Sequence, residues 1–292
     1  MDNFAGRIAA ITGAADGMGR SLAQLLAMEG CAVGLCDINA EGLDETARLI
    51  RAETPSARVV THQCDVSSEE ELSAFRDAIA TGFGTDTLNL LFNNAGIAGG
   101  GSMIDAPRDQ WERTFNVCWY GVYYGTRVFL PMLTAADEAH IINTSSVNGF
   151  WASLGPDRPH TAYSAAKFAV KGFTEALLTD LAVHAPHIKA SVVMPGHIGT
   201  GIAANSVVAH GEQPDPLMVE MAAQFRNTAP MTADEAAEVI LDGVREERWR
   251  ILVGADAHVL DLAVRDEPEA AYDPDFRDRL AGHFQGVTNR DD

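Results

Sequence analysis

The sequence contains no apolar run that approaches the roughly 20 residues of a membrane-spanning helix, which argues against an integral membrane protein. It is also poor in basic residues, with 21 Lys and Arg against 41 Asp and Glu, and its formal net charge is −20. A surface this acidic repels phosphate backbones and anionic headgroups, so we expect neither nucleic acid nor membrane as a partner. The first residues lack the basic segment of a secretory signal, so we expect a cytoplasmic protein.

Cysteine is also scarce. The chain has no CxxC pair, and its four cysteines are Cys31, Cys36, Cys64 and Cys118. Their apolar neighbours are typical of buried free thiols in a reducing compartment. Two pairs of residues with metal-ligating side chains, His184 with His187 and His62 with Cys64, are explained by a helix end and by core packing. We therefore expect no bound metal.

Short apolar runs alternate with helical patterns along most of the 292 residues. The expected strands are residues 8–12, 33–36, 59–63, 88–92, 140–143, 190–193 and 250–253. The helical patterns cover residues 18–28, 41–51, 69–80, 110–130, 162–183 and 233–246. Several strand runs are apolar throughout, as expected where helices cover both faces of a parallel sheet. The pattern predicts an α/β fold, a doubly wound parallel sheet of about seven strands in one domain, 1–292.

Two stretches interrupt the alternation. Residues 200–230 mix apolar residues with Gly, Pro and Asn after a strand end, where open α/β sheets bind ligands, and we expect a substrate lid there. Residues 266–292 contain eight Asp or Glu against three Arg. We expect this acidic C-terminal tail to pack loosely or to reach a neighbouring subunit.

A glycine-rich loop, TGAADGMG at residues 12–19, joins the first expected strand to the first helix. Gly13, Gly17 and Gly19 allow positive φ and let the backbone approach a pyrophosphate, and Asp16 and Met18 complete the loop. The N-terminus of the next helix offers free N–H groups and a positive dipole end. Three glycines alone often form only a tight turn, but this strand-to-helix position favours a dinucleotide cradle.

The choice of cofactor rests on Asp37, which ends the second expected strand about 20 residues beyond the glycines. A carboxylate there can bind both ribose hydroxyls and repels a 2′-phosphate. Asp16 adds to this repulsion, and Ile38 and Asn39 supply no cation. The alternative is an aspartate that only caps a loop. The electrostatic argument predicts NAD rather than NADP.

Two further groups follow strand ends on the ligand side of the expected sheet. Asp65 and Val66 follow the third strand, where the carboxylate could accept a hydrogen bond from an adenine amino group. Asn94, Ala95 and Gly96 follow the fourth strand, and the two small residues would let the backbone pass close to a nicotinamide ribose. As isolated peptides, both are ordinary turn sequences.

The motif YSAAK places Tyr163 and Lys167 four residues apart on an expected helix, so they share one face. A cation that close is expected to lower the pKa of the phenol towards neutrality and make it a usable base. Such a pair is common by chance and is usually a surface pair. Ser146, preceded by Ser145, follows the fifth strand, and Asn116 is an unusual interior polar residue in the long helix.

Taken in order, these elements resemble the classical short-chain dehydrogenase/reductases, which have a Rossmann-type fold. The matching elements are TGAADGMG, Asp37, Asp65, NNAG, Asn116, Ser146, YSAAK and PGHIGT at residues 195–200. The resemblance covers residues 7–200, and a family-like helix and strand end near residue 254. Two departures are Met18 in place of the commoner isoleucine, and a span at 147–161 that is longer than expected.

The resemblance implies a role for each matching residue. Tyr163 would be the base in alcohol oxidation or the acid in ketone reduction, and Lys167 would bind the nicotinamide ribose. Ser146 would hold the substrate oxygen, and Asn116 would anchor a water in a proton relay through Lys167. Further cofactor contacts are expected after the sixth strand, from Pro195, Gly196, Ile198 and Thr200.

The substrate is expected to be a hydrophobic secondary alcohol or its ketone, of aromatic, steroid-like or terpenoid-like character. Residues 200–230 are rich in apolar side chains and contain one arginine, Arg226, so an anionic substrate finds no cationic clamp. Besides Ser146, the expected substrate contacts are Asn148, Phe150, Trp151, His197 and Ile202.

Two alternatives to an NAD-dependent alcohol dehydrogenase are a non-catalytic NAD-binding sensor and an extended-type sugar-nucleotide epimerase or dehydratase. The first would not need the complete catalytic set, and the second typically has a separate substrate domain, for which little chain follows Thr200. The resemblance also implies a homodimer or homotetramer. Aromatic residues of the long helix are expected in the core and that interface: Trp111, Trp119, Tyr120, Tyr123 and Tyr124.

Overall fold

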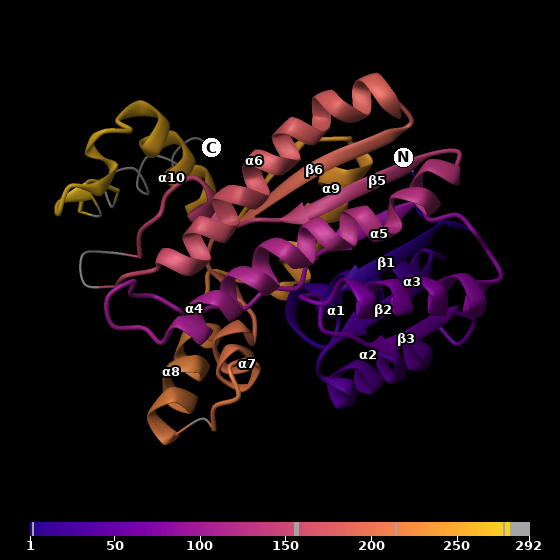
Figure 1. Cartoon of the computed structure of the whole chain (residues 1–292), viewed down its shortest axis with the longest axis horizontal. Helices are drawn as coiled ribbons and strands as arrows, with labels where there is room; N and C mark the ends of the chain where they lie inside the picture. The colour runs from indigo at the N-terminus through magenta and orange to yellow at the C-terminus, as the bar shows by residue number, and fades with distance from the viewer. Residues whose placement is uncertain (2, 155–157, 214, 277, 281–292) are drawn as a thin grey trace, which may run out of the picture.

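The computed structural model describes residues 1, 3–154, 158–213, 215–276 and 278–280. Seven parallel strands form one sheet in the order β3-β2-β1-β4-β5-β6-β9 (Figure 1). They are β1 (Ile8–Thr12), β2 (Ala32–Asp37), β3 (Val59–Gln63), β4 (Leu90–Asn93), β5 (Ala139–Thr144), β6 (Ile188–Pro195) and β9 (Arg250–Val253). The expected doubly wound parallel sheet is confirmed. Residues 281–292 of the expected tail lie outside the described part of the chain.

Helices cover both faces of this sheet (Figure 1). One face carries α1 (Gly17–Met28), α2 (Ala40–Glu53) and α9 (Ala233–Arg245). The other face carries α3 (Glu69–Phe83), α5 (Gly121–Ala135) and α6 (Thr161–His184). The long helix expected at 110–130 is α4 (Arg108–Phe115) continued into α5 through one π-helical turn, Asn116–Tyr120.

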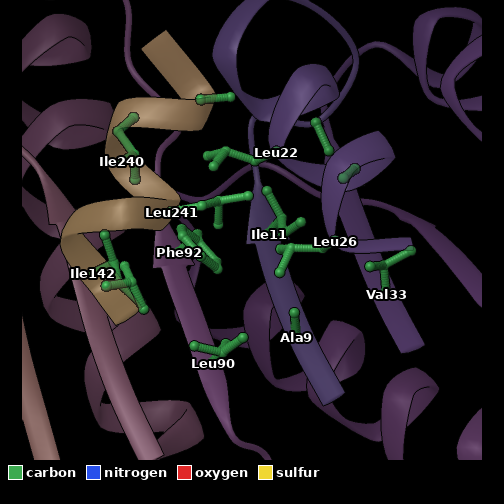
Figure 2. Packing of buried hydrophobic residues seen from close by; sticks show 14 of the residues in the cluster. Ala9, Ile11, Leu22, Leu26, Val33, Leu90, Phe92, Ile142, Ile240 and Leu241 are labelled. Atoms are coloured by element: carbon green, nitrogen blue, oxygen red, sulfur yellow. The ribbon is translucent and has the colours of Figure 1, made fainter. Parts of the chain in front are cut away.

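The core between the sheet, α1 and α9 shows how the apolar pattern produces this packing (Figure 2). Ile11 of β1 and Phe92 of β4 lie on one face of the sheet. Leu22 and Leu26, four residues apart in α1, meet them from above, and Leu241 of α9 packs beside them. Because all five side chains are buried, this core holds the C-terminal ends of β1 and β4 in fixed positions beneath the site.

The expected lid segment is bounded by a short ladder. β7 (Ile198–Gly199) pairs in parallel with β8 (Met231–Thr232), so residues 200–230 leave and return at the same place. Two helices that the sequence patterns did not predict lie between these strands, α7 (Ile202–Ala209) and α8 (Pro216–Asn227). Both project from the body of the protein beside α4 (Figure 1).

The described part of the acidic tail is packed against the protein. It follows α10 (Ala255–Asp266), which the sequence patterns also did not predict, and continues through a 3₁₀ turn, Ala270–Tyr272. Ala271, Phe276 and Leu280 are buried with Trp151 in a small core of their own. In this part of the tail, apolar side chains decide the packing although the surrounding sequence is acidic.

Candidate active site

A pocket of about 470 Å³ lies where β1, β2, β3 and β4 end. Eleven of the residues expected to bind a cofactor line it: Gly13, Asp16, Gly17, Met18, Asp37, Asp65, Val66, Asn94, Ala95, Gly96 and Thr200. The carboxyl ends of parallel strands meet at one edge of a sheet, which is why residues so far apart in sequence converge here.

The glycine loop wraps closely around the end of β4. Gly13 and Gly17 have φ of +69° and +54°, which side chains other than glycine rarely adopt. A methyl group on Gly13 would lie 2.8 Å from Ala95 Cα. Asp16 precedes α1 without capping it through its side chain, so the first N–H groups of that helix are available to an anion. This geometry fits the pyrophosphate of a dinucleotide.

Asp37 stands at the far side of the pocket as an oriented carboxylate. Its two oxygens accept hydrogen bonds from the backbone N–H groups of Ala15 at 3.1 Å and Asn39 at 2.9 Å. Burial raises the pKa of Asp37, and these backbone donors oppose the rise. The nearby cation, Arg20, is turned away, because its guanidinium donates to the Ala15 carbonyl and to Thr46.

Arg113 of α4 is a pocket residue that the sequence analysis missed. Its guanidinium lies 2.7 Å from Asp65 Oδ2 and 2.8 Å from Ser67 Oγ. Burial pushes the pKa of Asp65 upwards, but the hydrogen bonds from Ser67 and the charge of Arg113 outweigh it and leave this pKa lowered. Asp65 is thus held as a carboxylate beside the pocket. An arginine on the polar side of an amphipathic helix carries no sequence signal that would single it out.

Tyr163 and Lys167 lie together on α6, as expected from their spacing. Lys167 is only 2% exposed, and its Nζ donates to the Thr144 carbonyl at 2.8 Å and lies 5.3 Å from the centre of the Tyr163 ring. The Ser146 hydroxyl lies near the Tyr163 phenol and opposes the rise of its pKa. Ser145 is turned the other way and donates to the Lys167 carbonyl at 2.7 Å. The structure therefore selects Ser146 of the two serines as the partner of the phenol.

The expected lowering of the Tyr163 pKa is not found in this structure. Burial raises the pKa of the phenol, a nearby Cys118 adds to the rise, and the hydrogen bond from Ser146 opposes it. Burial also lowers the pKa of Lys167. The reason is geometric: the Lys167 ammonium faces the Thr144 carbonyl and the ring, and both groups lie in a desolvated environment.

The Asn116 side chain makes no direct contact with this cluster, and its expected role in a water-mediated relay stays a prediction. In the described part of the chain its side chain has no hydrogen bond, whereas Cys118, two positions later, is fully buried and donates from Sγ to the Ile97 carbonyl at 3.2 Å. A methyl group on Gly96 would lie 3.4 Å from Lys167 Nζ and 3.7 Å from Cys118 Sγ. Cys118 and Lys167 therefore both lie close to Gly96 of the pocket lining, and the sequence analysis had not singled out this cysteine.

His160 is a second residue that the sequence analysis missed. Its ring lies against the ring of Tyr163, with 4.7 Å between the ring centres. Burial lowers the pKa of His160 to about 4, so the imidazole is neutral at pH 7. It therefore provides a neutral, partly apolar wall beside the phenol.

Residues 7–210 match the family model for short chain dehydrogenase. The chain belongs to this family of oxidoreductases. It is 38% identical to the protein named SadH from Mycobacterium tuberculosis over 267 residues, which are 91% of this chain and 92% of SadH. It is 37% identical to epidermal retinol dehydrogenase 2 of Mus musculus over 201 residues, 68% of this chain and 63% of that protein. A short-chain dehydrogenase/reductase from Burkholderia phymatum, crystallised with NAD, has a TM-score of 0.82 and 31% identity, covering 94% of this chain and 98% of that chain.

Three substrate contacts expected in this dehydrogenase are corrected by the structure. Trp151 is 6% exposed, donates from its indole nitrogen to the Ala271 carbonyl at 2.7 Å and packs on Phe276. Phe150 packs against the same C-terminal core. Asn148 donates to the carbonyls of Trp151 and Ser153. All three therefore stabilise the loop after β5 and its contact with the tail.

His197 is also corrected. Its ring Nε2 bonds to the Phe225 carbonyl at 2.7 Å, and its backbone N–H donates to Asp256. Because a carbonyl can only accept, Nε2 carries the hydrogen, and His197 anchors the end of α8 rather than the substrate. Ile202, in contrast, does line the pocket. Six other residues expected at the cofactor do not line this pocket, and their contact with a cofactor stays a prediction: Gly19, Tyr163, Lys167, Pro195, Gly196 and Ile198.

None of the helices in the described part of the chain is long and apolar enough to cross a membrane. The same residues contain no group of three or more His, Cys, Asp or Glu side chains arranged to hold a metal ion.

Proposed function

We propose that this dehydrogenase uses NAD to interconvert a hydrophobic secondary alcohol and its ketone. The observation that carries the proposal is the group formed by Tyr163, the nearby Ser146 and the buried Lys167, whose ammonium lies 5.3 Å from the Tyr163 ring centre and directly behind Gly96 of the pocket lining. In this proposal, one proton-transferring oxygen and one hydroxyl donor serve the expected nicotinamide end of the pocket.

Each residue of the candidate site has a separate role in the proposed reaction. The dinucleotide supplies the hydride acceptor or donor. In reduction, the protonated Tyr163 gives its proton to the carbonyl oxygen; in oxidation, the phenol must first lose its own proton, and its oxygen then accepts the alcohol proton as the carbon–hydrogen bond breaks. Ser146 orients the substrate oxygen, and Lys167 holds a positive charge near the phenol. Neutral His160 limits water at the outer side of the Tyr163 ring.

The preference for NAD is supported by the charges around the pocket. Four carboxylates line it, from Asp16, Asp37, Glu41 and Asp65, against one guanidinium, Arg113. That guanidinium is paired with Asp65. A 2′-phosphate near Asp37 would therefore meet negative charge without a free cation.

The apolar substrate class is supported by the segment at 200–230. Ile202 and Val208 line the pocket mouth, and none of the α8 side chains is buried, although many are apolar: Leu217, Met218, Val219, Met221 and Phe225. The name of one relative, a retinol dehydrogenase, also refers to an apolar alcohol. We propose that residues 200–230 present these side chains to the substrate.

Oligomeric state and compartment are part of the proposal. Exposed apolar side chains on the long helix and α6, namely Tyr120, Leu130 and Phe168, support a homodimer or homotetramer. The four cysteines are all free and buried, which suits the reducing cytoplasm. Light scattering during gel filtration tests the subunit count.

The test is turnover of a panel of secondary alcohols by the purified full chain, followed by NADH fluorescence, with Tyr163→Phe and Tyr124→Phe as a matched pair. We expect Tyr163→Phe to lower kcat at least 10²-fold, because it removes the group that transfers the proton. Tyr124 stacks on Tyr120 away from the site and serves as control. Unchanged function in Tyr163→Phe would favour the NAD-binding sensor, and turnover of polyols or sugars alone would overturn the apolar substrate class.

A further inference from the structure

The helix α7 lies across the cofactor pocket rather than beside it. Ile202, Asn205, Val208 and Ala209 contribute to the pocket lining together with the glycine loop and the ends of β3 and β4. A dinucleotide bound in this pocket would therefore be in contact with α7 along one side. The contacts that hold α7 in this position determine how readily the pocket opens.

One set of contacts comes from a single face of α4. Gln110, Arg113 and Thr114 are spaced i, i+3 and i+4, so they project from the same side of this helix. Gln110 donates to Glu212 at 2.5 Å, and Arg113 Nε reaches the Ala209 carbonyl at 3.4 Å. Arg113 also holds Asp65, so one guanidinium joins the end of α7 to the pocket wall.

A second set of contacts holds the backbone of one residue beyond β4, Ala98. Ser206 Oγ accepts a hydrogen bond from the Ala98 N–H at 2.7 Å, and His210 Nε2 donates to the Ala98 carbonyl at 3.0 Å. Ser206 and His210 are four residues apart on the same side of the segment, so they hold both polar groups of Ala98. The next residue is glycine, and a methyl group on Gly99 would collide with the His210 ring. The ring fits only because position 99 lacks a side chain.

The opposite side of α7 touches the glycine loop, where Asn205 donates to Asp16 at 3.3 Å. The base of the segment is fixed by the β7–β8 ladder. The helix is thus held at its base, on the glycine loop and at its C-terminal end. Only the contacts with α4 and Ala98 lie far from the base.

We propose that α7 is a retaining cover over the dinucleotide, and that Ser206 and His210, with Arg113 behind them, form a latch that must open for the cofactor to enter or leave. This inference rests on the proposed dinucleotide-binding function and names the residues that control cofactor exchange. The three are positioning residues, because they act through the place of α7.

The latch makes a kinetic prediction that direct binding contacts do not make. Weakening a latch speeds both entry and release of the cofactor, so Kd changes less than either rate. Removing a group that only contacts the cofactor speeds release and leaves the association rate unchanged. The two rates together therefore separate a latch from a contact.

The experiment measures NADH association and dissociation by stopped-flow fluorescence on the full chain. We expect Ser206→Ala to raise both rates about fivefold, as the loss of one neutral hydrogen bond to Ala98 implies. His210→Phe should raise them at least as much, because His210 Nε2 contacts both the Ala98 carbonyl and Thr114 Oγ1 of α4. His210→Gln keeps a donor and should restore much of the wild-type behaviour. Ser73→Ala and His187→Phe are controls, because these side chains also bond to backbone carbonyls, at Glu69 and Thr134, away from the pocket.

A covalent cross-link tests the same inference in the opposite direction, because it should slow cofactor exchange. Gln110→Cys with Glu212→Cys places two exposed thiols across the latch, whereas the native cysteines are buried. A bis-maleimide joining them should slow both rates. Rates equal to those of the controls, faster release with unchanged association, or no effect of the cross-link would each overturn the latch. If the wild type bound neither NADH nor NADPH, the proposed function itself would have failed.

Discussion

Cys118 donates from Sγ to the carbonyl oxygen of Ile97 at 3.2 Å. This contact joins the π-helical turn after α4 to the chain segment that follows Gly96 in the pocket. It also sets the thiol beside Lys167 and Tyr163, with which it interacts electrostatically. The position of one buried thiol therefore affects both the backbone under the expected nicotinamide site and the surroundings of the proton-transferring pair.

Cys118→Ala is expected to lower kcat/KM roughly tenfold, because the buried Ile97 carbonyl loses its donor and the packing beside Lys167 loosens. Cys118→Ser keeps a donor and should stay within about threefold of wild type. Steady-state kinetics and NADH titration give the measurement, and NADH affinity should change less than kcat. Cys31→Ala removes another buried thiol, far from the site, and controls for packing. Equal kinetics in Cys118→Ala and Cys31→Ala would contradict the role of Cys118.

Asp37→Ser is expected to reduce the preference for NAD over NADP by about 10- to 100-fold, since one carboxylate near the 2′ position is removed. The backbone donors of Ala15 and Asn39 would then be free for a phosphate. The ratio of kcat/KM for the two cofactors is the measurement. Asp44→Ser controls for the change in net charge, because Asp44 is an exposed residue of α2 outside the pocket lining. A wild type that prefers NADP would contradict the electrostatic argument.

Local patterns were sufficient for the elements that carry them. Short, largely apolar runs located the seven strands, and the glycines after β1 and the i, i+4 pair on α6 located the two ends of the candidate site. These features depend on residues within one or two turns or on a strand end. They are therefore visible in the sequence.

The features that the sequence did not predict depend on contacts between distant segments. Trp151 resembled a pocket aromatic because its partner Ala271 comes 120 residues later. The position of Cys118 beside the cluster was not predicted, because the π-helical turn sets which side chains of the long helix face Lys167, and periodicity does not reveal that turn. The role of Arg113 depends on its contact with the Ala209 carbonyl of α7, which lies 96 residues later in the sequence.

The corrected place of Trp151 has consequences for stability. Trp151→Ala is expected to cost about 3–5 kcal/mol of the free energy of unfolding, because it opens a cavity beside Phe276 and leaves the Ala271 carbonyl without its donor. Trp151→Phe should cost less and leave the substrate KM unchanged. Urea unfolding and steady-state kinetics measure the two effects. Trp249→Phe, at an exposed tryptophan, is the control. A raised substrate KM in Trp151→Phe, with an unchanged free energy of unfolding, would show instead that the indole contacts the substrate.

His140 makes the fold sensitive to acid. It is 1% exposed, its Nε2 bonds to Ser191 Oγ at 2.7 Å, and Ser191 in turn donates to the Arg248 carbonyl. Because the Ser191 hydroxyl hydrogen is donated to the Arg248 carbonyl, Ser191 Oγ must accept from His140, and Nε2 carries the hydrogen of a neutral imidazole. Burial lowers the pKa of His140 to about 4 from an ordinary 6.5.

Because the folded pKa of His140 is the lower one, the unfolded chain takes up the proton first as the pH falls. The stability that depends on neutral His140 is complete above pH 6.5 and declines between pH 6.5 and pH 4. By pH 5 the loss reaches about 2 kcal/mol. His140→Gln cannot take up this proton. Between pH 7.5 and pH 5, its free energy of unfolding should therefore fall by about 2 kcal/mol less than that of the wild type. His184→Gln, at an exposed histidine, should show a much smaller shift in urea unfolding. Parallel pH profiles for wild type and His140→Gln would contradict a buried neutral imidazole.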